Sequence, residues 1–249
     1  MEFRFPLAII AVAMLVSGCA SMSAEDCSVA DWRSIGLSDG QRGELLSKAD
    51  RRSKDCGKHG VAMDRLAYEA GRNEGLSRYC IESTGYELGE SGRAYNGVCV
   101  EHGEAAFLAA FDRGREYRSF SMAVVSAADS LSTAHRRHDE LDAKLDKYWS
   151  GYRDEGLTAE EHNNMVLDLW AERKYLAEKA IPYWTQAQDT AQRELDDYRQ
   201  KIASGDPSLG SLRPSDFAGP EPYSGPTKED ARAMLQEVFS TIGQASRDR

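Results

Sequence analysis

The sequence lacks an apolar run long enough to cross a membrane. Its main apolar run, residues 5–16, is shorter than the about 20 residues that a membrane-spanning helix needs. Arg4 precedes this run, and small residues follow it. This order is typical of a cleaved secretory signal, here residues 1–18. We therefore expect an exported chain.

Cys19 stands directly after the predicted signal. The stretch Val16-Ser17-Gly18-Cys19 resembles the lipobox of bacterial lipoproteins. The resemblance implies a mature chain that begins at an acylated Cys19, with palmitate among its acyl chains, and several acyl chains anchor a protein stably. It also favours the outer membrane, because Ala20 stands where an aspartate would favour the inner one. We expect a lipid anchor on the periplasmic face of the outer membrane; an ordinary signal with an incidental cysteine is the alternative.

An excess of positive charge is also missing. The net charge is −10 and the sequence pI is about 5.1. This balance argues against nucleic acid as a partner, because such binding needs clustered positive charge. The composition is polar, rich in Ala, Glu, Asp, Arg and Lys, and has only seven phenylalanines. It favours a helical protein with a modest core.

Cysteine is absent after residue 99. Besides Cys19, the chain holds four cysteines: Cys27, Cys56, Cys80 and Cys99. In an oxidising compartment they predict two disulfides in one small domain. Three pairings are open, and we favour Cys27–Cys56 with Cys80–Cys99 because these close the shortest loops. A zinc site is not favoured, because no closely spaced C-x2-C pair exists.

Catalytic motifs are missing as well. The sequence has no nucleophile elbow, phosphate loop or dinucleotide fingerprint. His135, His138, Asp139 and Asp142 could share a helix and hold zinc, but the H-E-x-x-H pattern is absent and His138 falls on a predicted heptad core position. We expect no metal, no cofactor and no enzymatic activity.

Glycines recur beside aromatic residues in the first half of the chain. A glycine inside a helix costs about 1 kcal/mol relative to alanine, so the repetition needs a reason. We favour close helix packing over a carbohydrate-binding interpretation of the aromatics. The repeated elements are Tyr68-x-x-Gly71-Arg72, Tyr86-x-x-Gly89 and Phe111-x-x-Gly114-Arg115.

Three longer patterns carry a family resemblance. They are W-x3-G-x2-DG-x2-G from Trp32, Y-x2-GR-x2-GL-x2-YC from Tyr68, and G-x2-G-x2-Y-x-GVC from Gly89. Together they resemble Gram-negative lipoproteins that are catalogued only as a domain of unknown function. The resemblance covers about residues 27–118. It implies a module of that extent and a place in the cell envelope, and it supplies no catalytic residues.

A coiled-coil repeat follows this module. Apolar positions alternate gaps of three and four, at Leu131, Ala134, His138, Leu141, Leu145, Tyr148 and Tyr152. Gly156 can end this helix, and the Thr158 to Glu161 stretch is a capping box that opens the next. Pro182 should kink or divide the second arm. A short turn between two long amphipathic helices predicts an antiparallel hairpin whose arms reach about 60 Å.

Proline concentrates near the end of the chain. Five of the seven prolines lie in 204–226, which predicts an extended linker or surface wrap. Thr227 should cap a last amphipathic helix that docks back on the hairpin. The expected organisation is all-α: signal 1–18, lipidated tether 19–30, disulfide-stapled head 31–118, hairpin 119–203, linker 204–226 and docking helix 227–249.

These features favour a non-catalytic envelope protein that acts through protein–protein contacts, as an adaptor or an assembly factor. The alternative is a carbohydrate- or peptidoglycan-binding module, or an enzyme subunit, that uses the head. Covalent attachment to peptidoglycan is not expected, because the chain ends in Arg249 rather than in lysine. Non-covalent binding to peptidoglycan stays open.

Overall fold

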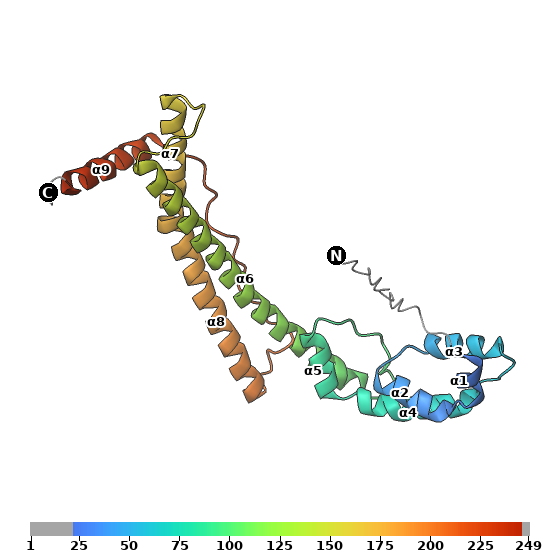
Figure 1. The fold of residues 1–249 in the computed structure, drawn as a ribbon. Helices are drawn as coiled ribbons and strands as arrows, with labels where there is room; N and C mark the ends of the chain where they lie inside the picture. The colour runs from blue at the N-terminus through green and yellow to red at the C-terminus, as the bar shows by residue number, and fades with distance from the viewer. Residues whose placement is uncertain (1–21, 246–249) are drawn as a thin grey trace, which may run out of the picture. The chain divides into compact units, whose positions relative to one another are not determined.

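The computed structural model describes residues 22–245, and side chains up to residue 237 (Figure 1). The predicted signal and the predicted lipidation site Cys19 lie outside these residues. Within them all regular structure is helical, which confirms the all-α prediction. No helix of this part of the chain is long and apolar enough to span a membrane.

Short turns join most of the helices, whereas longer segments precede α6 and α9. In chain order they are α1 (Ala24–Ser28), α2 (Trp32–Gln41), α3 (Ser47–Gly57), α4 (Arg65–Tyr79), α5 (Glu82–Glu90), α6 (Glu104–Trp149), α7 (Ala159–Tyr175), the π-helical turn η1 (Leu176–Ala180), α8 (Ile181–Ser204) and α9 (Lys228–Ala245).

The chain divides into two compact units. Unit 1 holds the residues up to 84 together with 95–107, and unit 2 holds 85–94 together with 108–249. The expected boundary at residue 118 lies inside α6, which begins in unit 1 and continues in unit 2. The division differs from the expectation because one uninterrupted helix belongs to both units.

The core of unit 1 gathers around Tyr68. Its buried members also include Cys27, Trp32, Ala49 and Cys56. Ser23 and Asp26 form a capping box at the start of α1. The prediction of a polar tether is therefore wrong for residues 22–30, because the burial of Cys27 draws this segment into the core.

Glycines let α2 and α4 approach closely. A Cβ at Gly36 would lie 2.0 Å from the Tyr68 carbonyl oxygen, and a Cβ at Gly71 would lie 2.0 Å from that of Arg33. The same relation recurs in unit 2, where Gly89 faces the carbonyl of Phe111 and Gly114 that of Tyr86. The packing interpretation of the glycines is confirmed.

The two glycine-packed helix pairs are copies of one pattern. Gly36, Gly40 and Gly43 have the same spacing as Gly85, Gly89 and Gly92. Cys56 precedes Gly71 by the same interval as Cys99 precedes Gly114. The structure pairs Cys27 with Cys56 and Cys80 with Cys99, so each copy carries one disulfide. The favoured pairing is thereby confirmed.

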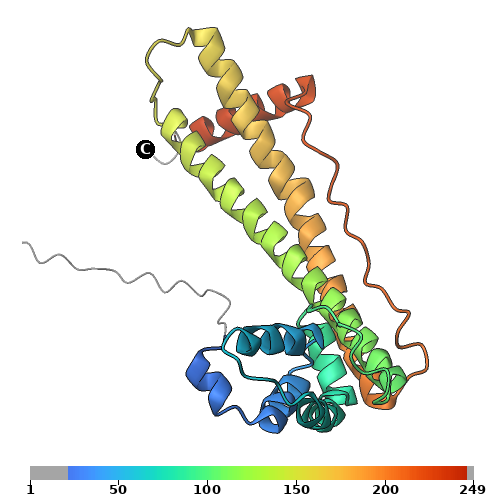
Figure 2. The same cartoon turned by 90° about the vertical axis from the view of Figure 1, so that its right-hand side faces the viewer.

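In unit 2, α6 packs along α7, η1 and α8 as an antiparallel hairpin (Figure 2). Ala134, Leu141 and Leu145 are buried in its core, as the heptad pattern predicts. Tyr152 lies beyond the end of α6 and is exposed, so the last predicted heptad position is wrong. Thr158 caps α7 with the expected capping box.

Pro182 interrupts the second arm. A proline has no N–H, and its ring clashes with the carbonyl four residues earlier in a regular α-helix. The chain widens just before it into η1, where the N–H of Ile181 donates to the carbonyl of Leu176. The predicted division of this arm is confirmed.

The strap, residues 206–227, runs back along the hairpin in both views (Figures 1 and 2). Glu116, which is 3% exposed, accepts from the N–H groups of Gly210 and Leu212 at 2.7 and 2.6 Å. The strap is thus a surface wrap rather than a free linker.

The last helix also returns to the hairpin. Thr227 caps α9 through Asp230. The indole of Trp170 in α7 then donates to Glu237 at 3.1 Å. Through these contacts α9 lies against α7 of the hairpin.

Candidate functional site

The end of the hairpin exposes large apolar side chains. We call Trp149, Tyr152 and Leu157 the hairpin tip; they are 41%, 42% and 42% exposed. All three lie where α6 ends and the turn to α7 begins. Tryptophan and tyrosine are enriched among the residues that dominate binding energy at protein interfaces. The hairpin tip is therefore a candidate contact surface.

Neighbouring side chains stabilise the hairpin tip. The Tyr148 hydroxyl donates to Asp154 at 2.7 Å, and this hydrogen bond raises the pKa of the tyrosine. The Lys147 ammonium lies 3.5 Å from the centroid of the Tyr152 ring. His162 is buried and meets the Tyr148 ring edge-on. These contacts stabilise the turn, so the exposed side chains of the hairpin tip have defined positions.

A shallow groove runs along α6 itself. Met122 and Val125 are half exposed within it. Its other lining residues are small or polar: Ser126, Asp129, Ser130 and Thr133. This groove is a weaker candidate than the hairpin tip, because it offers no aromatic anchor.

A deeper cleft of about 540 Å³ opens between η1 and the strap. We call it the strap cleft. Tyr175, Tyr183 and Tyr223 line it, together with Pro220 and Pro222. The Tyr175 hydroxyl donates to the carbonyl of Glu221, and Gly219 donates to the hydroxyl of Tyr183 at 3.2 Å. Those bonds hold the strap as one wall of the cleft.

Charged groups stand at the ends of the strap cleft. Lys174 pairs with Asp230 at 2.9 Å. The hydroxyl of Thr227 and this ammonium lower the pKa of Asp230 to about 2. Burial raises the pKa of Tyr223, and its hydrogen bond to Asp168 adds to the effect. At neutral pH the tyrosine is neutral and the ion pair is charged.

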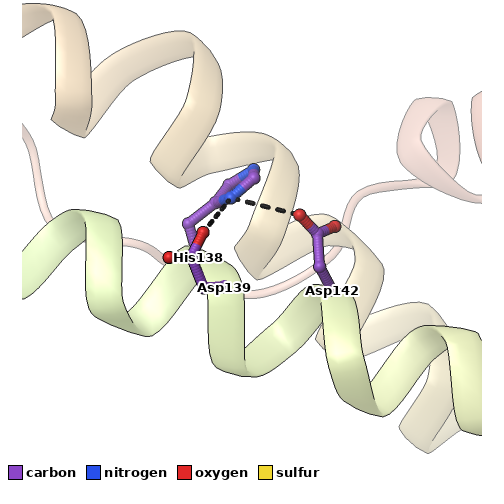
Figure 3. A group of neighbouring side chains, drawn as sticks. All are labelled: His138, Asp139 and Asp142. Carbon is purple, nitrogen blue, oxygen red and sulfur yellow. Dashed lines mark ion pairs between the residues drawn. The ribbon is translucent and has the colours of Figure 1, made fainter.

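His138, Asp139 and Asp142 form a cluster on α6 with the donor types of a metal site (Figure 3). His138 Nδ1 lies 3.3 Å from Asp142 and 3.7 Å from Asp139, and the three could in principle ligate one ion. His135 is exposed and is not part of this group. Arg173 already pairs with Asp142 at 3.0 Å. A cation would compete with that guanidinium, so the group fits an ion-pair network better than a metal site.

The position of His138 differs from the expectation. Its side chain is 24% exposed, at the edge of the hairpin core rather than inside it. Asp142 lies 3.3 Å from its Nδ1 and in turn pairs with Arg173. A partly exposed imidazole beside a carboxylate keeps access to polar partners and to water, which explains why a histidine is tolerated at a heptad position.

In unit 1 the notable charged residue is Asp39, which is fully buried. Its carboxylate accepts from Arg42 at 2.9 Å, Arg52 at 3.1 Å and the Tyr68 hydroxyl at 3.0 Å, and Lys48 lies 3.5 Å away. Burial raises the pKa of Asp39, but the surrounding cations and hydrogen bonds outweigh it and the net pKa is lowered. This arrangement is a structural anchor, because its carboxylate is fully occupied.

A small groove of about 300 Å³ also lies in unit 1, beside Arg72 and the exposed Leu45 and Val100. Only one carboxylate, that of Glu101, lines it. The enzyme or carbohydrate hypothesis for the head expects a pocket with converging carboxylates, and this groove does not provide one.

The fold thus defines an all-α protein with a disulfide-stapled, glycine-packed module and a long hairpin. Residues 31–116 match a family model described as "Protein of unknown function (DUF2799)". This match confirms the resemblance to a family catalogued only as a domain of unknown function, over the module that carries the glycine motifs. Neither a curated protein nor a solved structure matches the chain.

The sequence motifs did not point to the hairpin tip or the strap cleft. The cleft joins residues of η1 and the strap that lie far apart in the sequence, and no periodic pattern marks such a meeting. One signal was present: prolines alternate with other residues around Tyr223, at Pro220 and Pro222. Extended proline segments pack readily on aromatic side chains, and Tyr175 and Tyr183 lie on either side of η1.

Proposed function

We propose that this protein is a lipid-anchored component of the outer membrane that faces the periplasm and works without catalysis. In this proposal it acts as an adaptor or assembly factor, through contacts with another envelope protein. The sequence supports the anchor through the signal and Cys19. The two disulfides suit an oxidising compartment.

The observation that carries the contact function is the hairpin tip. An exposed tryptophan, tyrosine and leucine lie at one turn, and the tryptophan and tyrosine are residue types enriched at interface hot spots. A partner would cover this surface with an apolar socket, since isolated charges are depleted from the centre of such contacts.

Site-specific photo-crosslinking in intact cells tests the contact. A photoreactive phenylalanine analogue at Trp149 or Tyr152 should yield a discrete crosslinked product. The matched control is the same analogue at Ser132, which is exposed on α6 about 25 Å along the helix from Trp149. The absence of a tip-specific product, or the same products from the control, would contradict the proposal.

Membrane fractionation with a labelled fatty acid tests the anchor separately. The wild type should carry the label and sediment with the membranes. Cys19→Ala should lose the label and appear in the soluble fraction. Undiminished label in the variant would exclude acylation at this residue, without bearing on the tip contact.

A further inference from the structure

We propose that the strap cleft is a binding site for a neutral saccharide of two or three rings. The site is separate from the hairpin tip, and the inference does not depend on the contact proposed there. Four observations carry it: the size of the cleft, its apolar walls, its hydrogen-bonding groups and its balance of charge.

The size of the cleft suits a short oligosaccharide. Binding sites for small molecules usually have volumes of about 300–1,000 Å³, and this cleft of about 540 Å³ lies in that range. The strap forms one wall, and residues of α7, η1 and α8 form the other, so a ligand would lie in a half-open trough. An extended chain of sugar rings can continue out of such a trough at its open side.

The walls offer flat apolar surfaces. The rings of Tyr175 and Tyr223 lie 5.7 Å apart and tilted by 42°. Pro220 and Pro222 extend this surface along the strap. The face of an aromatic ring is electronegative, so it attracts the weakly positive C–H groups that cover one face of a pyranose. An apolar wall of this kind holds a sugar without demanding charge.

Hydrogen-bonding groups line the same cleft. The Tyr183 hydroxyl accepts the N–H of Gly219, and that bond does not use its own proton. Glu178 and Lys179 are exposed in η1 at the rim, and neither forms an ion pair with another residue in the described part of the chain. Sugar hydroxyls both donate and accept, so they suit a rim that offers both kinds of partner.

The charges of the cleft disfavour an anion. Three carboxylates line it, those of Glu178, Glu221 and Asp230, against the two ammonium groups of Lys174 and Lys179. Because Lys174 is occupied by Asp230, the remaining charge is negative. A phosphate or carboxylate ligand would be repelled, and a purely hydrocarbon ligand would leave the polar rim without partners. A neutral, hydroxyl-rich ligand satisfies both conditions.

The π-turn places the two rim residues. Glu178 and Lys179 both belong to η1, and the wider turn alters the direction in which side chains leave the helix. Single π-turns inside helices occur frequently at functional sites. Here the turn that precedes Pro182 coincides with the cleft, and both of its charged residues line it.

Titration of the full-length chain in detergent tests the proposal. The probes are chitobiose, cellobiose and maltose, with inorganic phosphate as the anionic control, and the readouts are calorimetry and tryptophan fluorescence. We expect at least one disaccharide to bind and phosphate not to bind. The double variant Glu178→Gln with Lys179→Met should weaken that binding about tenfold or more, since it removes hydrogen bonds to charged groups.

The matched control is Glu160→Gln with Lys144→Met, two exposed residues outside the cleft. It should bind as the wild type does, and both double variants should keep the wild-type melting temperature. No disaccharide binding up to about 20 mM, which corresponds to a negligible affinity, would overturn the proposal. Equal binding by the cleft variant and the wild type, or equal loss in the control, would overturn it as well.

Sedimentation with purified peptidoglycan sacculi identifies the source of the saccharide. Sedimentation that is abolished by the cleft variant and by free disaccharide assigns the site to a wall glycan. Disaccharide binding without sedimentation assigns it to a soluble oligosaccharide. Both results uphold the site, whereas sedimentation that the cleft variant leaves unchanged would remove the wall glycan as its ligand.

Discussion

The backbone N–H of Leu212 donates to the carboxylate of Glu116 at 2.6 Å, across 96 residues of sequence. The same carboxylate accepts from Gly210 and from the Tyr198 hydroxyl, and Arg213 approaches it at 3.6 Å. The buried carboxylate of Glu116 in α6 therefore connects three segments through hydrogen bonds: α6 itself, α8 and the strap.

Glu116→Gln should release this end of the strap. The amide nitrogen would face N–H groups that need an acceptor, so at least one buried donor would lose its partner. We expect a loss of about 2–3 kcal/mol in the free energy of unfolding, together with faster amide exchange at residues 208–216. Denaturant unfolding and hydrogen exchange measure the two effects. Glu155→Gln, an exposed control in the turn, should change neither stability nor exchange. Equal effects in both variants would contradict the role of Glu116 as the anchor of the strap.

Gly71→Ala should destabilise unit 1 strongly. The new methyl group would lie 2.0 Å from the carbonyl oxygen of Arg33, so α2 and α4 would have to move apart. Overpacking of this kind costs about 3 kcal/mol. Gly57→Ala is the matched control, because no atom lies within 4 Å of the added Cβ, and it should gain about 0.4–1 kcal/mol. Thermal and denaturant unfolding compare the pair, and a Gly71→Ala protein as stable as the control would refute the close-packing argument.

Removal of either disulfide should lower stability by about 3–4 kcal/mol, because each bridge restricts the unfolded chain. The bridges join residues 29 and 19 positions apart, so the loss should be slightly larger for Cys27 and Cys56. Paired Cys→Ala variants, unfolded under oxidising conditions, give the two values. Under reducing conditions the wild type should approach the variant that lacks both bridges, and an insensitive wild type would contradict the prediction.

Asp39 should make unit 1 sensitive to acid. Its pKa is lowered in the folded state from the ordinary value of 3.8, so its contribution to stability is complete above that value and is lost as the pH falls through the folded pKa. Asp39→Asn removes the buried charge that Arg42, Arg52 and the Tyr68 hydroxyl contact and should cost about 1.5–3 kcal/mol at pH 7. Unfolding measured between pH 2 and 7 should show the two proteins converging below about pH 4; a constant difference across this range would exclude the role of the carboxylate charge.

The sequence predicted those parts of the fold that local chemistry determines. Thr158 and Glu161 indicate the start of α7 because a capping box needs only four consecutive residues. The heptad positions at Leu141 and Leu145 indicate the buried face of α6 because a helix repeats its faces regularly. The disulfide pairing followed from loop length alone.

Long-range relations were less predictable. Cys27 looked like part of a tether because its neighbours are polar, and only its partner Cys56 explains its burial. The strap was expected as a linker or wrap. The sequence of residues 206–227 alone does not indicate that Glu116 is the residue that binds it. One clue was available, since Glu116 lies one helical turn before the buried Phe120, and an acid within an apolar stripe needs a partner.

The family match ends at residue 116, while α6 continues without interruption to Trp149. A helix can gain or lose heptads at such a point without a change in the residues that pack the module, provided that the opposite arm changes with it. Each heptad alters the length by about 10 Å. The shared helix therefore separates two kinds of evolutionary change: the module can stay constant while the distance to which the hairpin extends is adjusted in fixed steps.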